Sequence, residues 1–305
     1  MKRVWILSFA ATALFAAESG TVAIPFAGYI GYGSQSVKES GYFAGVYLST
    51  GLREGNLEFQ YLYSDISYRD GSDDLTQNDV AIAYGSRYGE NLYLRGGVHY
   101  IDSDDLYTDG GLTVFGGAEY SGQKPYTFGA DIYYTSYSNF DPSLDVWQIS
   151  PYAGSTIVDS SDGILYLKAR YNFITFKSSQ IEETVVGMNS RMGGETDRAP
   201  FVITRYSEYT DTYHSVEVEL THYYKAFETV GSVWVGKQAF AVKDGGFTVY
   251  NLAEIHKGGL SLRTTYSYSR SLFAGAGISY ERFTDTQNGE DSGMTLFTAS
   301  LGYRF

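Results

Sequence analysis

The chain has 305 residues, contains no cysteine and carries a formal net charge of −13. Without cysteine, disulfides, thiolate metal sites and lipid attachment through an N-terminal cysteine are excluded. A negative charge of this size argues against nucleic acid as a partner, because contacts to phosphate require lysine and arginine.

The first residues have the pattern of an export signal. Lys2 and Arg3 precede a largely apolar stretch, residues 4–13, which leads to a pair of alanines. We therefore expect a signal peptide over residues 1–17. The apolar stretch is too short for a membrane anchor, which needs about 20 residues. The remaining chain, residues 18–305, is expected to be one domain.

The rest of the chain combines low average hydropathy with many aromatic residues. Its mean hydropathy is −0.22, and no apolar run approaches the length of a membrane-spanning helix. Yet the chain holds 30 tyrosines and 18 phenylalanines. In a transmembrane β-barrel only every second residue contacts lipid, and aromatic residues line both membrane interfaces. We therefore predict an all-β protein, a transmembrane antiparallel up-and-down β-barrel.

Alternating apolar and polar positions recur in segments of strand length. Leu57, Phe59 and Tyr61, for example, share one face of a predicted strand, while Glu58 and Gln60 share the other. The predicted strands cover residues 21–33, 42–48, 57–64, 80–85, 92–100, 112–120, 128–134, 147–153, 165–173, 216–221, 230–242, 260–266, 272–280 and 293–305. Their number is about fourteen, with twelve to sixteen possible.

The connections between these strands alternate in length. Short ones, such as residues 53–56 and 89–91, are followed by longer acidic ones, such as 69–79 and 102–109. Bacterial transmembrane barrels have short turns on the periplasmic side and longer loops outside. The rhythm therefore places both chain ends in the periplasm.

Two segments do not fit this rhythm. Residues 178–210 are too long for a hairpin loop, and long connections without secondary structure are usually functional or disordered. We hypothesise that this segment folds inward and narrows the lumen, with Arg191 and Arg198 pairing with lumen carboxylates. The alternative is that it extends its two flanking strands. Residues 243–257 are expected to form an outer loop, with an extra strand over 247–255 as the alternative.

The last thirteen residues form a strand that ends on an aromatic side chain. Phe297, Leu301, Tyr303 and Phe305 lie on one face of it. This ending resembles the bacterial outer-membrane β-barrel proteins, whose final strand commonly ends in phenylalanine after alternating apolar positions. The resemblance implies that the last strand pairs with the first, and that Tyr303 and Phe305 form a signal for the barrel-assembly machinery. It also implies export through the inner membrane to the outer membrane of a Gram-negative bacterium, with the lipid bilayer and lipopolysaccharide as partners.

The charged residues of the strands are expected to face the lumen. A charged side chain on the lipid face costs about 2–4 kcal/mol near the membrane midplane, so such residues are forced inward whatever the function. The lumen-lining candidates are Glu58, Arg95, His99, Glu119, Asp131, Lys168, Arg170, Glu217, Glu219, Arg263 and Glu281. Because a barrel widens with strand number, we expect an aqueous lumen at about fourteen strands.

No enzyme motif is recognisable in the sequence. His214 and Ser215 are adjacent, but neighbouring side chains of a strand point to opposite faces and so cannot readily share a proton. Neither a cofactor nor a metal site is expected. We favour a porin-like channel for passive diffusion of small solutes. The alternatives are a structural or surface-interaction barrel with a blocked lumen and an outer-membrane lipid-modifying enzyme; a homo-oligomer is compatible with each.

Overall fold

The computed structural model describes residues 20–71, 74–104, 109–123, 125–138, 143–161, 163–187, 201–243, 248–249, 254–284 and 289–305. The expected signal peptide and the proposed constriction residues Arg191 and Arg198 lie outside this part of the chain. Among the described residues, no helix is long and apolar enough to cross a membrane.

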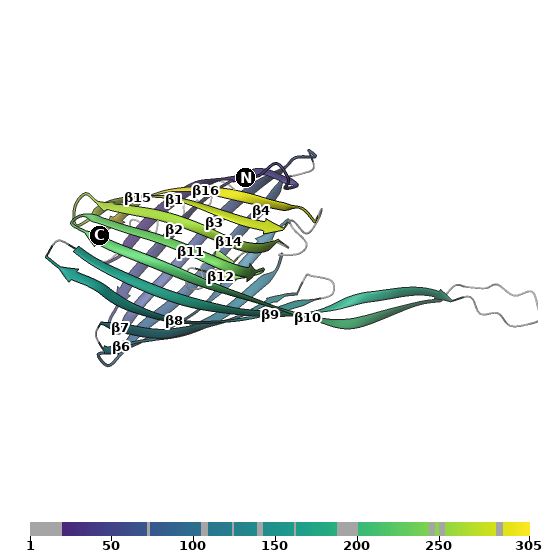
Figure 1. Ribbon diagram of the computed structural model, residues 1–305, viewed down its shortest axis with the longest axis horizontal. Helices are drawn as coiled ribbons and strands as arrows, with labels where there is room; N and C mark the ends of the chain where they lie inside the picture. The colour runs from purple at the N-terminus through teal and green to yellow at the C-terminus, as the bar shows by residue number, and fades with distance from the viewer. Residues whose placement is uncertain are drawn as a thin grey trace, which may run out of the picture.

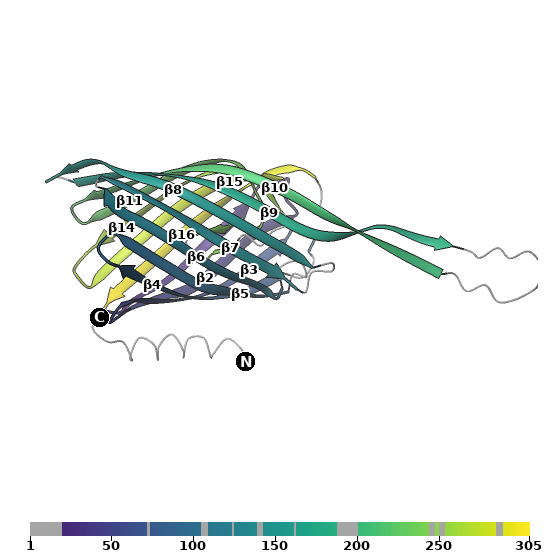
Figure 2. The ribbon, with the colours of Figure 1, turned by 90° about the horizontal axis from the view of Figure 1, so that it is seen from below.

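Fourteen antiparallel strands form one closed barrel (Figures 1 and 2). They are β1 (Val22–Tyr32), β2 (Lys38–Leu52), β3 (Gly55–Tyr68), β4 (Leu75–Tyr88), β5 (Leu92–Ser103), β6 (Gly111–Gln123), β7 (Tyr126–Tyr137), β8 (Leu144–Ser160), β9 (Gly163–Gly187), β10 (Phe201–Tyr224), β11 (Phe227–Gln238), β14 (Ile255–Ser267), β15 (Leu272–Thr284) and β16 (Asp291–Arg304). Each strand pairs with the next strand of the wall, and β16 pairs with β1. The predicted up-and-down barrel and its strand number are confirmed.

The alternation of side chains explains how one sequence makes both faces of this wall. On β4, Ala81 and Ala83 are buried inside the barrel, whereas Ile82 and Tyr84 are exposed on the outer face. On β16, Phe297 and Leu301 are likewise exposed outward. Successive side chains of a strand point to opposite faces, so an apolar outer face and a more polar inner face require this period of two.

The first and last strands close the barrel in a continuous register. Val22 lies opposite Arg304 at one end of the pair, and Tyr32 lies opposite Met294 at the other. Beyond β16, the backbone N–H of Phe305 donates to the Thr21 carbonyl oxygen at 2.9 Å. The predicted pairing of the last strand with the first is therefore confirmed, while the role of its end in assembly stays a prediction.

The two ends of the barrel differ in their connections. We call the end that holds the start of β1 and the C-terminus the terminal end, and the opposite one the loop end (Figure 2). Connections at the terminal end are short, as between β2 and β3 or between β10 and β11. Those at the loop end are longer, as between β5 and β6 or between β11 and β14. This is the predicted rhythm of short and long connections.

The hairpin of β9 and β10 is much longer than the wall. Leu144 of β8 lies opposite Ser178, and beyond it β9 has only β10 as a neighbour, out to the pair of Gly187 and Phe201. This part of the hairpin projects past the loop end (Figures 1 and 2). For residues 178–187 and 201–210 the predicted inward loop is therefore wrong. The alternative, an extension of the two flanking strands, is what the structure shows there.

The wall strand β11 ends earlier than predicted, at Gln238. The chain then leaves the wall, and β12 (Val242–Lys243) pairs with β13 (Thr248–Val249) in a small separate sheet. The expected outer loop over 243–257 is wrong at its two ends, because Lys243 belongs to β12 and β14 begins at Ile255. Of the alternative, an extra strand over 247–255, the structure describes the two-residue strand β13, which lies outside the barrel sheet. The segment that enters the barrel here is residues 239–243, which we call the inward segment.

Candidate functional site

A polar cavity lies in the lumen, in the half nearer the terminal end. Its volume is about 330 Å³. The lining residues are Tyr93, Arg95, Gly117, Ala118, Glu119, Asp131, Tyr152, Lys168, Arg170, Glu217, Glu219 and Lys243. Four carboxylates and four cationic groups therefore face one another in a single space.

The register of the wall places these charges side by side. On β9 and β10, Arg170 lies opposite Glu217, and Lys168 lies opposite Glu219. Directly opposite residues share one face of a sheet, with Cβ atoms about 5 Å apart. The wall thus carries two neighbouring pairs of opposite charge on its lumen face.

On β3 and β5, the Arg95 guanidinium forms an ion pair with Glu58 at 2.6 Å, behind the cavity lining. On β7 and β9, Arg170 approaches Asp131 at 3.7 Å. The Asp131 carboxylate occupies the space that a side chain at Gly117 would fill, because a Cβ there would lie 2.2 Å from Asp131 Oδ1. A glycine on β6 therefore makes room for a charge on β7.

Tyr152 of β8 links the acidic and basic sides of the cavity. Its hydroxyl donates to Glu119 at 3.0 Å. Its ring lies 4.5 Å from Lys168 Nζ and 5.5 Å from the Arg170 guanidinium carbon. Such cation–π contacts hold the cationic groups along the wall without neutralising them.

A second cavity of about 250 Å³ continues the polar lining toward the terminal end. It shares Tyr93 and Glu119 with the first cavity and adds Arg87, Glu90 and Ser121. Polar space therefore extends from the middle of the barrel toward the turn between β4 and β5.

The inward segment closes the other side of the main cavity. The wall strand becomes irregular at Gly236, whose φ of +123° belongs to the left-handed region, and the register shifts between Val235 and Gln238, the last wall residue before the inward segment. A Cβ at Gly236 would lie 2.2 Å from the His214 carbonyl oxygen, so both the conformation and the space favour glycine. The next turn of the chain is made by Phe240, whose φ is +51°. A bulky residue rarely adopts this conformation unless its surroundings impose it.

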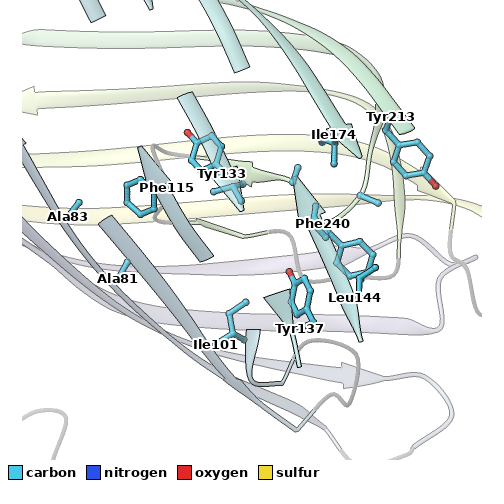
Figure 3. Close-up of a cluster of buried hydrophobic side chains, with 14 residues drawn as sticks. Ala81, Ala83, Ile101, Phe115, Tyr133, Tyr137, Leu144, Ile174, Tyr213 and Phe240 are labelled. Carbon is cyan, nitrogen blue, oxygen red and sulfur yellow. The ribbon is translucent and has the colours of Figure 1, made fainter. Parts of the chain in front are cut away.

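Apolar packing holds Phe240 in that conformation. Its ring centroid lies 5.4 Å from that of Tyr137 and 6.1 Å from that of Phe176. Figure 3 shows Phe240 and Tyr137 together within a cluster that also contains Leu144 and Ile174. Ile101 and Ile174 are fully buried there. The loop-end half of the lumen is therefore filled, whereas the terminal half holds the cavity.

A chain of uncharged hydrogen bonds fastens the segment to the wall. The Gln148 side chain donates to the Val242 carbonyl oxygen at 2.9 Å and accepts from the Val242 N–H at 2.7 Å. Gln238 donates to Ser215 at 2.6 Å. Asn172 also donates to Ser215 at 3.2 Å and accepts from Ser150 at 2.8 Å, so the network crosses β8 to β11.

Charged groups add a second attachment. Lys243 Nζ lies 3.3 Å from Glu281 and 4.8 Å from the Trp234 ring. His256 lies 2.9 Å from Glu281 and 3.7 Å from Glu254, and Lys38 is paired with Glu254 at 2.8 Å. Since Lys243 also lines the cavity, the inward segment is both the cover of the cavity and part of its surface.

Comparisons with known proteins support the architecture. No family model and no curated protein matches the sequence. The structure is similar to the CymD monoaromatic hydrocarbon channel, with a TM-score of 0.57 and 8% identity over 98% of this chain and 92% of that one. It is also similar to the Ralstonia pickettii toluene transporter TbuX, with a TM-score of 0.55 and 8% identity over 95% and 90% of the two chains.

A third similar structure is a bacterial polysaccharide outer membrane secretin, with a TM-score of 0.53 and 12% identity over 95% of this chain and 100% of that one. The fold is that of an outer-membrane β-barrel. At these identities the likeness concerns the fold alone. The first two proteins are named for aromatic hydrocarbons and the third for a polysaccharide, so the solute must be inferred from the lumen of this barrel.

The predicted lumen residues occupy distinct places in this barrel. Those that line the main cavity are Arg95, Glu119, Asp131, Lys168, Arg170, Glu217 and Glu219. Glu58 reaches the cavity through Arg95, and Glu281 contacts the inward segment. His99 is fully buried and lies 2.8 Å from Asp79, while Arg263 on β14 lines neither cavity.

Several residues of the site were not predicted. Lys243 was expected in an outer loop. Gln148 and Gln238 were not singled out, because the residues that they contact lie far away in the sequence or on the turn that leaves the wall. The bonds between Gln148 and Val242 span 94 positions. A polar residue within an otherwise apolar stretch was the only available signal.

His214 and Ser215 face opposite sides of the wall, as expected. Ser215 is buried in the network that fastens the inward segment, whereas His214 is exposed and lies 2.5 Å from the Tyr171 hydroxyl. Within the described chain, no three His, Asp or Glu side chains come together in a way that could hold a metal ion.

Proposed function

We propose that this chain is an outer-membrane channel for passive diffusion of small polar solutes, and that the structure describes its closed state. The observation that supports this best is the polar cavity inside a wall with an apolar outer face. Eight charged groups without water would be too costly to keep in a barrel interior, so such a cavity is hydrated. A barrel that only anchors a surface structure has no need of this space.

The inward segment acts as the gate in this proposal. It is attached by side-chain hydrogen bonds, by ion pairs and by the packing of Phe240, and not by the hydrogen-bond ladder of the wall. Each attachment contributes about 0.5–3 kcal/mol, so the segment can move while the wall stays folded. Outward movement of residues 239–243 would connect the cavity with the loop end.

A barrel with a permanently blocked lumen is the second candidate. The filled loop-end half favours it, because Tyr137, Ile101 and Ile174 are fully buried there. The two candidates differ in one measurable respect. A gate opens when its attachments are weakened, whereas a structural core loses stability without forming a path for ions.

Single-channel recording in planar bilayers separates the two. We expect rare openings for the native chain and an open probability about tenfold higher for Gln148→Leu, which removes both bonds to Val242. The matched control is Gln77→Leu, since Gln77 is also buried but bonds to Asp79 on the same strand. Silence of both variants, with intact folded barrels, would show that the lumen is blocked.

A further inference from the structure

Three charged groups of the main cavity are left without a direct polar partner. Lys168, Glu217 and Glu219 form neither a hydrogen bond nor an ion pair with any other residue that the structure describes. The ammonium group of Lys168 lies over the Tyr152 ring, at 4.5 Å from its centroid. All three project from β9 and β10, two rigid neighbouring strands, so their spacing is fixed by the wall.

The charge of the cavity is balanced, although the chain as a whole carries −13. A solute with only a negative charge would be attracted by Lys168 and Arg170 but repelled by the nearby carboxylates. A solute with only a positive charge would be attracted by the carboxylates but repelled by Lys168 and Arg170. A zwitterion gains from both sets of groups. This gain is larger in a narrow protein cavity than in bulk water, because the charges are less screened.

The spacing of the groups also fits a molecule with two opposite charges. Lys168 lies opposite Glu219, and Arg170 lies opposite Glu217. Opposite residues have Cβ atoms about 5 Å apart, a span that a short amino acid can bridge. The volume of about 330 Å³ is at the lower end of the range for small-molecule sites.

We propose that the cavity binds a small zwitterion, a molecule that carries one ammonium and one carboxylate group. The ammonium lies at Glu217 and Glu219, and the carboxylate lies at Lys168 and Arg170. As a statement about the solute that the channel admits, this inference rests on the proposed function. The binding site itself depends only on the cavity.

Isothermal titration calorimetry on the full chain in detergent tests the site without any conductance. The probes are 4-aminobutyrate, butyrate and butylammonium, which match in size and differ in charge. We expect saturable binding of 4-aminobutyrate, at least about tenfold tighter than that of either singly charged probe. The double variant Lys168→Met with Glu219→Gln keeps the net charge and should weaken this binding more than tenfold. Arg263→Gln, which changes a charge outside both cavities, should leave it unchanged.

The possible results separate this inference from the proposed function. Equal affinity for the three probes, or equal effects of the cavity variant and Arg263→Gln, would overturn the zwitterion site. Binding as expected in a chain that never conducts would support the site and refute the channel. Conductance without selective binding would support the channel and refute the site.

Discussion

Replacement of Phe240 by alanine tests whether the inward segment is a gate. Phe240 is the residue that packs the segment into the lumen, with its ring against those of Tyr137 and Phe176. Its side chain is 7% exposed, and its φ of +51° persists because this packing holds it. Alanine removes the ring and leaves the polar attachments of the segment in place.

The expected effect follows from what the ring contributes to the closed state. Full burial of such a side chain is worth about 1.5–3 kcal/mol. Contact with its two aromatic neighbours adds to this, because a favourable aromatic pair is worth about 0.5–1.5 kcal/mol beyond burial. If the ring is hydrated when the gate is open, Phe240→Ala shifts the equilibrium by about 3 kcal/mol, which is roughly a hundredfold increase in the ratio of open to closed channels.

The control for this experiment is Phe115→Ala. Phe115 is also 7% exposed and belongs to the same apolar cluster, but it is part of the wall strand β6. Its loss should lower the thermal stability of the barrel and leave the open probability near that of the native chain. Open probability is measured by single-channel recording, and folding by circular dichroism. An unchanged open probability for a folded Phe240→Ala variant would refute the gate.

Three further results are expected. Gly236→Ala places a Cβ against the His214 backbone at a left-handed φ, so it should lower the yield of folded barrel or displace the inward segment. The control is Gly231→Ala on the same strand, whose Cβ meets nothing closer than 3.9 Å and which should behave as the native chain. Deletion of Phe305 should lower the amount of barrel assembled in cells but change the melting temperature little, because its side chain lies at the exposed end of the wall. Normal assembly of the shortened chain would refute its role as a signal. The unboiled protein should migrate differently from the boiled protein on a semi-native gel, because every backbone group of a closed wall is bonded within it; identical migration would count against a closed wall.

The sequence predicted the wall well because the bilayer imposes a strict pattern on it. Ile82 and Tyr84 must differ from Ala81 and Ala83 in environment, and this constraint repeats on every strand. The inward direction of charges such as Glu217 followed from the same cost of exposing charge to lipid. The number of strands and the set of side chains that face the lumen could therefore be predicted without any knowledge of contacts.

The same reasoning failed where that constraint ends. Residues 178–187 and 201–210 pair beyond the barrel, where neither lipid nor lumen selects one face, so their alternation was too weak to distinguish from a loop. The apolar residues 239–242 looked like the continuation of a wall strand. Only the backbone turns at Gly236 and Phe240 redirect them into the lumen, and a pattern of side chains does not reveal a positive φ.

The position of Lys243 links the gate to the charge of the open pore. In the closed state this residue completes the balance of four cationic groups and four carboxylates around the cavity. Movement of the inward segment removes Lys243 from that surface and breaks its ion pair with Glu281 at 3.3 Å, while Glu281 keeps its contact with His256. The open lumen then holds an excess of carboxylates, so we expect it to favour cations. A reversal potential measured across a potassium chloride gradient tests this, and Glu219→Gln should weaken the preference whereas Lys168→Met should strengthen it. Anion selectivity in the open state would show that Lys243 remains at the cavity and that some other part of the chain moves.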